Sequence, residues 1–156
     1  MGRGVGGRPT DYHDGRSLVR AVRALLDTNV LIALLKADEV TPNLSGFTGL
    51  MISSLSFSEL YMGVATAGAN SLVRRAREDR IAKIRATFGA GLPYDDTCAL
   101  AFGVVSEEVL RNGALPKSHV VDKMIAATAM AHGLALVTRN LADFRHLTNL
   151  VQVEEC

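Results

Sequence analysis

The sequence has few cysteines and no long apolar run. Its 156 residues include only two cysteines, Cys98 and Cys156, which are too few to build a disulfide framework. The longest stretch without a charged residue, 40–58, contains a proline, two glycines and five serines, and this composition excludes a membrane-spanning helix. A secretory signal is not expected either, because the arginine-rich start leads into only three apolar residues, 24–26, before Asp27. We therefore expect a cytoplasmic protein without a membrane anchor.

The net charge is also small, +1 at pH 7, so it neither favours nor excludes a nucleic-acid partner. The first 23 residues are rich in glycine and carry five arginines against two aspartates, which predicts a disordered basic arm. The remainder, 24–156, is slightly acidic. With 48% hydrophobic residues in the whole chain, this part is long enough for one domain with a buried core.

Within the acidic body, one predicted helix carries a cluster of basic side chains. The helix spans about 72–88, and its basic residues are Arg74, Arg75, Arg77, Arg80, Lys83 and Arg85. Such a run is typical of a solvated helix face, and it is also the kind of surface that binds RNA phosphates. Both interpretations stay open.

Short apolar segments alternate with longer amphipathic ones along the chain. The apolar segments predict strands near 24–26, 50–53, 91–94, 134–138 and 150–153. The amphipathic segments predict helices near 28–37, 57–66, 72–88, 97–111 and 119–132, with a short helix after residue 138. Strands that alternate with helices form parallel sheets with helices on both faces, so we predict an α/β fold.

Four acidic residues follow predicted strands or lie near the start of predicted helices: Asp27, Glu59, Asp122 and Asp143. Each of them alone has an ordinary explanation, because acids in the first turn of a helix act as caps or interact with the helix dipole. Ser56 and Glu59 match a capping box, for example. However, the carboxyl ends of parallel strands lie at one edge of the sheet, and there the four acids would converge.

Carboxylates that lie side by side need a cation, because like charges cannot all stay ionised without one. We therefore expect Asp27, Glu59 and Asp122 to share a metal ion. No cysteine or histidine recurs at matching positions, and we interpret His119 and His132 as ordinary helix-surface or helix-end residues. The ligands are then hard oxygens, which favour Mg²⁺ or Mn²⁺ over zinc.

Three segments of the sequence resemble a known family. They are LLDTNVLIALL at 25–35, ISSLSFSELYMGV at 52–64 and VVDKMIAATAMAHGLALVTRNLADF at 120–144. These segments are similar to the motifs of PIN-domain ribonucleases of the VapC type, the toxins of bacterial type II toxin–antitoxin pairs. The resemblance implies a PIN-like α/β domain with a parallel sheet of about five strands and Mg²⁺-dependent endoribonuclease activity. It also implies a homodimer and inhibition by a cognate antitoxin.

The resemblance also suggests roles for individual residues. Asp27 and Asp122 match the metal-binding aspartates of the family, and Glu59 matches its glutamate. Asp143 is the fourth catalytic candidate, although many relatives have an acid where this chain has Asn140. Polar side chains beside these acids are expected to orient a carboxylate or a water molecule through hydrogen bonds. These residues are Thr28, Asn29, Thr138 and Asn140.

This set of residues suits the hydrolysis of RNA phosphodiester bonds by metal-activated water. Two alternatives stay open. One is a PIN-like module that binds RNA or a protein partner without cleaving. The other is a receiver-like signalling domain, which would need a pair of acids after its first strand and a lysine after its last. The chain has the single Asp27 and Thr138–Arg139 at these places.

Overall fold

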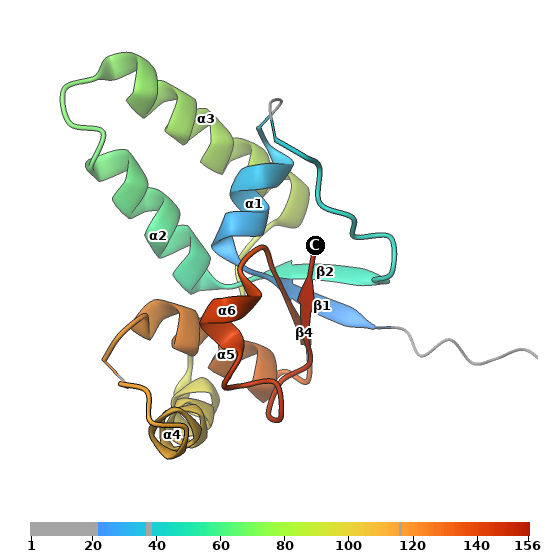
Figure 1. Ribbon diagram of the computed structural model, residues 1–156. Helices are drawn as coiled ribbons and strands as arrows, with labels where there is room; N and C mark the ends of the chain where they lie inside the picture. The colour runs from blue at the N-terminus through green and yellow to red at the C-terminus, as the bar shows by residue number, and fades with distance from the viewer. Residues whose placement is uncertain (1–21, 37–38, 116) are drawn as a thin grey trace, which may run out of the picture.

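The computed structural model describes residues 22–36, 39–115 and 117–156 (Figure 1). The predicted basic arm lies outside the described residues, except for its last two positions. Arg23 already belongs to the first strand, which therefore begins one residue before the predicted boundary.

A parallel sheet forms the centre of the fold. Its strands are β1 (Arg23–Leu26), β2 (Gly49–Ile52), β3 (Ala135–Thr138) and β4 (Val153–Glu155). They are arranged in the order β2-β1-β3-β4, and every neighbouring pair is parallel. Leu26 pairs with Ile52 on one side and with Val137 on the other, so β1 and β3 are central and end together. The predicted α/β fold with a parallel sheet is confirmed.

The sheet has four strands rather than about five. The segment predicted as a strand at 91–94 makes only a single parallel bridge, between Leu92 and Ser53. Beside it, β2 ends at Ile52 and a helix begins at Ser54, so there is no partner strand to continue the ladder. The last strand also begins later than predicted, at Val153, because residues 147–151 form turns.

Six helices surround the sheet within the described residues. They are α1 (Thr28–Leu34), α2 (Ser54–Ala65), α3 (Ser71–Phe88), α4 (Asp96–Arg111), α5 (Val120–Ala131) and α6 (Leu141–Phe144). None of them is both long enough and apolar enough to cross a membrane.

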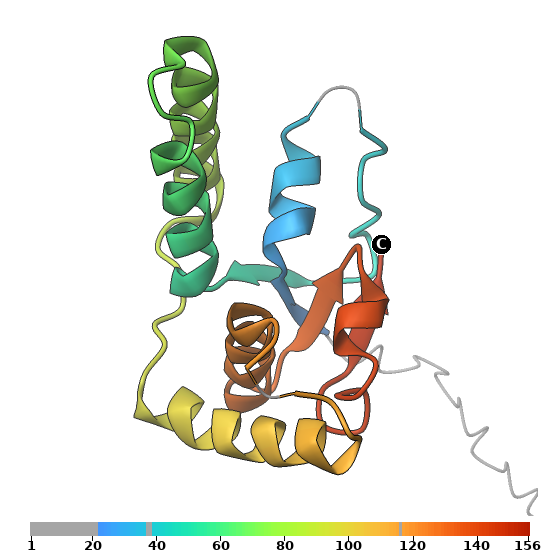
Figure 2. The same cartoon turned by 60° about the vertical axis from the view of Figure 1, so that its left-hand side comes forward.

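Helices cover both faces of the sheet because the side chains of each strand alternate between them. Ala24 and Leu26 of β1 pack into a core with α1, α2 and α3, whereas Leu25 packs into a second core with α4, α5 and α6. Figure 2 shows α4 and α5 on one side of the sheet and α1, α2 and α3 on the other. The sheet edge at which β1 and β3 end therefore lies between two layers of helices.

Candidate functional site

Asp27 follows β1 directly and is the N-cap of α1. Its Oδ1 accepts a hydrogen bond of 2.7 Å from the backbone N–H of Thr28, and its Oδ2 accepts one of 2.8 Å from the hydroxyl of Thr138. The side chain is only 4% exposed. Burial raises the pKa of Asp27 to about 6 against the effect of these hydrogen bonds, and the nearby Asp122 and Glu59 raise it further by charge repulsion. Asp27 is a cap, but one placed in a buried cluster of acids.

Glu59 approaches Asp27 from α2. Its Oε2 accepts a hydrogen bond from the hydroxyl of Thr28. The side chain is partly buried, and this burial, together with the charge of Asp122, raises its pKa. The capping-box interpretation of Glu59 is wrong, because the N-cap of α2 is Ser53, whose hydroxyl accepts from the N–H of Leu55. Glu59 therefore lies in the second turn of the helix and points to the residue after Asp27.

Asp122 and Asp143 complete the acidic cluster. Asp122 lies in the first turn of α5 and Asp143 in α6. Burial raises the pKa of Asp122, and repulsion by Asp143 raises it further. One ligand atom of each carboxylate and one ring nitrogen of His119 lie within 4.8 Å of one another, a group that could hold a metal ion. The sequence interpretation of His119 as an ordinary helix-end residue missed this contact: its Nδ1 lies 3.2 Å from Asp122 Oδ2.

The four polar residues predicted to orient the acids form a hydrogen-bonded network around them. The hydroxyl of Thr138, at the end of β3, donates to Asp27 and accepts from the N–H of Asn140 at 3.0 Å and from Asn29 Nδ2 at 3.3 Å. The amide of Asn140 donates to Asp143 Oδ2 at 2.6 Å. Asn29 Oδ1 accepts from the N–H of Arg139 at 3.1 Å. Together with Thr28, these residues form a chain of hydrogen bonds that runs from Glu59 through Asp27 to Asp143.

The basic residues of α3 are not equivalent in the structure. Arg77 and Arg80 are partly buried and line a groove of about 660 Å³ that also includes Lys36, Thr28 and Glu59. The other four are exposed. Among them, Arg74 pairs with Glu78 at 2.9 Å, and Arg85 lies 4.3 Å above the ring of Phe57. Only two of the six predicted RNA-binding residues therefore line the groove that reaches the acids.

A buried lysine next to the acids was not identified from the sequence. Lys123 follows Asp122, and its Nζ donates to the backbone carbonyl oxygens of Leu115, at 2.9 Å, and Ser118. Burial lowers its pKa. These bonds fasten the loop before α5 to the helix that carries Asp122. The spacing Leu115 to Lys123 gives no recognisable motif in the sequence.

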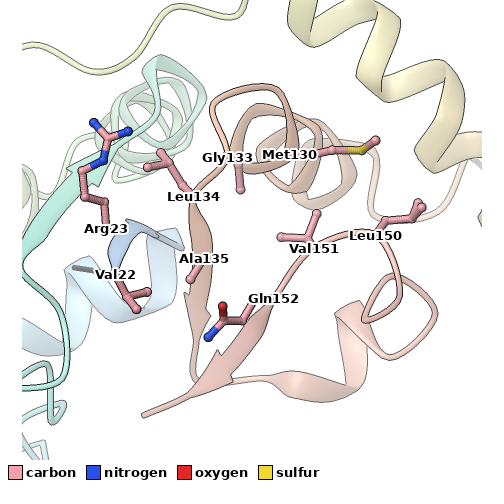
Figure 3. A pocket seen from close by; sticks show the side chains of 10 residues that line it. Val22, Arg23, Met130, Gly133, Leu134, Ala135, Leu150, Val151 and Gln152 are labelled. Atoms are coloured by element: carbon pink, nitrogen blue, oxygen red, sulfur yellow. The ribbon is translucent and has the colours of Figure 1, made fainter. Parts of the chain in front are cut away.

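A second cavity, of about 400 Å³, lies at the opposite edge of the sheet (Figure 3). It is formed at the amino-terminal ends of β1 and β3 by residues that include Val22, Arg23, Ala135 and Gln152. Among the described residues that line it, none is an acid or a histidine. The acidic edge is therefore the candidate site.

Known proteins are similar to this chain over most of its length and of their own. Ribonuclease VapC2 of Haemophilus influenzae is 29% identical over 132 residues, which cover 83% of this chain and 95% of that protein. The tRNA(fMet)-specific endonuclease VapC of Salmonella typhimurium is 28% identical over 132 residues, with the same coverage.

Solved structures agree with the sequence comparison. The structure of DNA-bound VapBC from Salmonella typhimurium matches with a TM-score of 0.68 and 26% identity, covering 86% of this chain and 98% of that one. FitAcB from Neisseria gonorrhoeae matches with a TM-score of 0.66 and 26% identity, covering 83% and 95%. The family model of the PIN domain matches residues 24–150. The resemblance found in the sequence is confirmed: this chain belongs to the PIN-domain family.

Proposed function

We propose that this protein is a metal-dependent endoribonuclease and the toxin of a type II toxin–antitoxin pair. Its membership of the PIN-domain family and its similarity to proteins named VapC ribonucleases support this function. The observation that carries the proposal is the cluster of acids at the carboxyl edge of the sheet, in which burial and the charge of Asp122 raise the pKa of both Asp27 and Glu59. Acids that were only helix caps would not need to be gathered in this way.

The donor set of the cluster fits a divalent cation. Asp122 and Asp143 each offer a carboxylate oxygen within 4.8 Å of the other, and Asp27 lies near enough to Glu59 and Asp122 for their charges to raise its pKa. Oxygen donors suit Mg²⁺ and Mn²⁺. A cation would offset both the burial and the charge repulsion that raise the pKa of each of these carboxyl groups. When bound, such an ion lowers the pKa of water and neutralises negative charge that grows on the phosphodiester.

The surrounding residues hold the acids in place for this chemistry. The N–H of Thr28 and the hydroxyl of Thr138 each engage one oxygen of Asp27, so its carboxylate has a fixed orientation. The amide of Asn140 engages one oxygen of Asp143. Such partners determine the direction and basicity of a ligand's lone pairs. A site with fixed carboxylates loses little energy to rearrangement when an ion and an RNA strand bind.

RNA is proposed to reach the acids along the groove beside α3. Lys36, Arg77 and Arg80 line this groove together with Glu59, so positive charge lies next to the acidic cluster. Contacts of basic side chains with phosphates supply most of the sequence-independent affinity for RNA. We assign the remaining basic residues of α3 to the solvated face of the helix.

Two protein partners belong to the proposal. The solved structures named above include VapBC complexes, which supports a cognate antitoxin that covers the acidic edge, for instance with an arginine paired to the carboxylates. A homodimer is proposed through α2 and α3. Leu60 and Val64 belong to the protein's own core, but Met62 and Leu72 stay 59% and 78% exposed. A cytoplasmic location stays a prediction of the sequence.

The alternatives differ in what they predict for RNA. A receiver-like domain is set aside by the family membership. A PIN-like module that only binds would retain RNA without cutting it. Purified protein should therefore be incubated with total RNA in Mg²⁺, in Mn²⁺ and in EDTA. We expect cleavage with either ion and none in EDTA; intact RNA under all three conditions would contradict the proposed activity.

A further inference from the structure

His119 adopts an unusual backbone conformation next to the acidic cluster. Its φ and ψ angles are 49° and 48°, and it is the only non-glycine residue with positive φ in the part of the chain that the structure describes. It is the N-cap of α5, yet its side chain makes no capping hydrogen bond. The left-handed conformation is unfavourable for a residue with a Cβ, so the surrounding structure must hold it there.

The loop before α5 supplies this support. Lys123, which is buried, binds the carbonyl oxygens of Leu115 and Ser118 through its Nζ. Its backbone N–H also donates to the carbonyl oxygen of His119 at 3.2 Å. The loop is thus fixed on both sides of His119. The consequence of this geometry is that the imidazole ring faces Asp122 rather than the helix's own N–H groups.

The distances in the cluster fit a common ion. His119 Nδ1 lies 3.2 Å from Asp122 Oδ2, and all three ligand atoms, including that of Asp143, lie within 4.8 Å of one another. Ligands about 2.1 Å from one octahedral ion lie about 3.0 Å apart when adjacent and about 4.2 Å apart when opposite. The three atoms can therefore reach one ion with small movements of their side chains.

We propose that His119 Nδ1 is a ligand of the divalent cation, together with Asp122 and Asp143, and that it makes the site bind Mn²⁺ in preference to Mg²⁺. This inference rests on the proposed function. Mg²⁺ prefers oxygen ligands, whereas imidazole nitrogen suits transition metals and binds them more strongly. In the neutral ring, Nδ1 can act as a ligand when the proton is on Nε2. The nitrogen donor adds selectivity to a site whose other predicted ligands are carboxylates.

The test compares His119→Asn with the wild type and with His132→Ala. Asparagine tolerates the left-handed conformation and can still donate to Asp122, but it offers no imidazole nitrogen. His119→Gly also accepts this backbone and removes the side chain altogether. His132 is an exposed residue at the other end of α5 and controls for the loss of a histidine.

Metal binding is measured on the whole protein without RNA, so the readout does not depend on catalysis. Dissociation constants for Mn²⁺ and Mg²⁺ come from competition followed by Mn²⁺ electron paramagnetic resonance, and pulsed measurements on the Mn²⁺ complex detect coupling to a ligand ¹⁴N nucleus. We expect this coupling in the wild type and in His132→Ala but in neither His119 variant. The preference for Mn²⁺ over Mg²⁺ should fall by about tenfold in His119→Asn.

An unchanged preference in His119→Asn, or ¹⁴N coupling that persists in it, would overturn the proposal. An equal loss of affinity for Mn²⁺ and Mg²⁺ would also overturn the proposal, because His119 would then only orient Asp122. The proposed function is tested separately by RNA cleavage of the wild type. If the wild type shows the ¹⁴N coupling but leaves RNA intact, His119 is a metal ligand but the proposed nuclease function is wrong.

Discussion

The hydroxyl of Thr138 donates to Oδ2 of Asp27 across 2.8 Å, although the two residues stand 111 positions apart in the chain. The bond joins the ends of the two central strands, because Thr138 ends β3 and Asp27 follows β1. Without it, one oxygen of a buried carboxylate would lose its hydrogen-bond donor. The acidic edge thus depends on the pairing of strands that are distant in sequence.

Thr138→Val should weaken both the fold and metal binding. The change keeps the shape of the side chain but leaves the Asp27 oxygen without this partner, which costs about 1–3 kcal/mol of unfolding free energy. Loss of an orienting partner also lowers metal affinity by about 10–100-fold. Urea denaturation and Mn²⁺ titration measure the two effects. Thr128→Val is the control, because Thr128 is equally buried but bonds to Met124 within α5; equal metal affinity in both variants would argue against the role of Thr138.

The metal-free protein should lose stability as the pH rises past the pKa of the Asp27 carboxyl group. The pKa of this group is raised from 3.8 to about 6 by folding, so the folded state binds the proton more tightly than the unfolded chain. Its contribution to stability is complete below about pH 4 and is lost as the pH rises through about 6, by at most about 3 kcal/mol. Other groups titrate too, so the quantity to follow is the difference in unfolding free energy between the wild type and Asp27→Asn.

Without metal, Asp27→Asn should be more stable than the wild type at pH 8, and the advantage should shrink at pH 4. Urea denaturation in EDTA at the two pH values measures this difference. Added Mg²⁺ should then stabilise the wild type more than the variant, because only a ligand that binds the folded state shifts the equilibrium. If the difference in unfolding free energy between the wild type and Asp27→Asn is the same at both pH values, the surroundings do not disfavour the charged form of Asp27.

Arg80→Ala should weaken RNA binding more than Arg75→Ala does. Arg80 lines the groove that contains Glu59, whereas Arg75 is exposed on the same helix. Removing one phosphate contact to single-stranded RNA should reduce the slope of log affinity against log salt by about 0.7. Binding of a labelled RNA in the Asp27→Asn background, at several salt concentrations, provides the slope. If the two arginine variants behave alike, RNA does not follow the groove.

Leu72→Glu should disrupt the proposed homodimer. Leu72 lies in the first turn of α3 and is 78% exposed, and a charge at this position opposes burial against a second copy. Light scattering at tens of micromolar should give a dimer mass for the wild type and a monomer mass for the variant. Leu100→Glu, at a comparably exposed leucine of α4, should remain dimeric. A monomeric wild type would contradict the prediction.

The sequence predicted the parallel sheet because the strands follow local patterns of apolar residues. The apolar segments before Asp27 and Thr138 are short and uninterrupted, so they identify the two central strands. The helix that carries Glu59 begins at Ser54, three residues before its predicted start at 57. Ser53, Ser54 and Ser56 can each cap a helix, and the choice of Ser53 depends on where β2 stops pairing with β1.

Features that depend on tertiary contacts were not predictable. The strand expected at 91–94 fails because its neighbour turns into α2, which no property of its own residues reveals. The conformation of His119 is fixed by the bonds of Lys123 to a loop several residues away. Histidine at a helix start carries no signal of its own, and only the position of Asp122 three residues later could have suggested the contact.

Asp27 is proposed to be a catalytic carboxylate and not only a helix cap. Asp27 and Asp95 are both N-caps whose side chains accept from backbone N–H groups, at 2.7 Å and 3.0 Å, but Asp27 is buried near Glu59 and Asp122 whereas Asp95 is exposed. Asparagine caps a helix about as well as aspartate, so capping is preserved in both variants. The decisive measurement is the rate of RNA cleavage in Mg²⁺ by Asp27→Asn and Asp95→Asn. We expect the cleavage rate of Asp27→Asn to fall by about 100-fold or more, while Asp95→Asn keeps the wild-type rate. Equal rates in the two variants would show that Asp27 is only a helix cap.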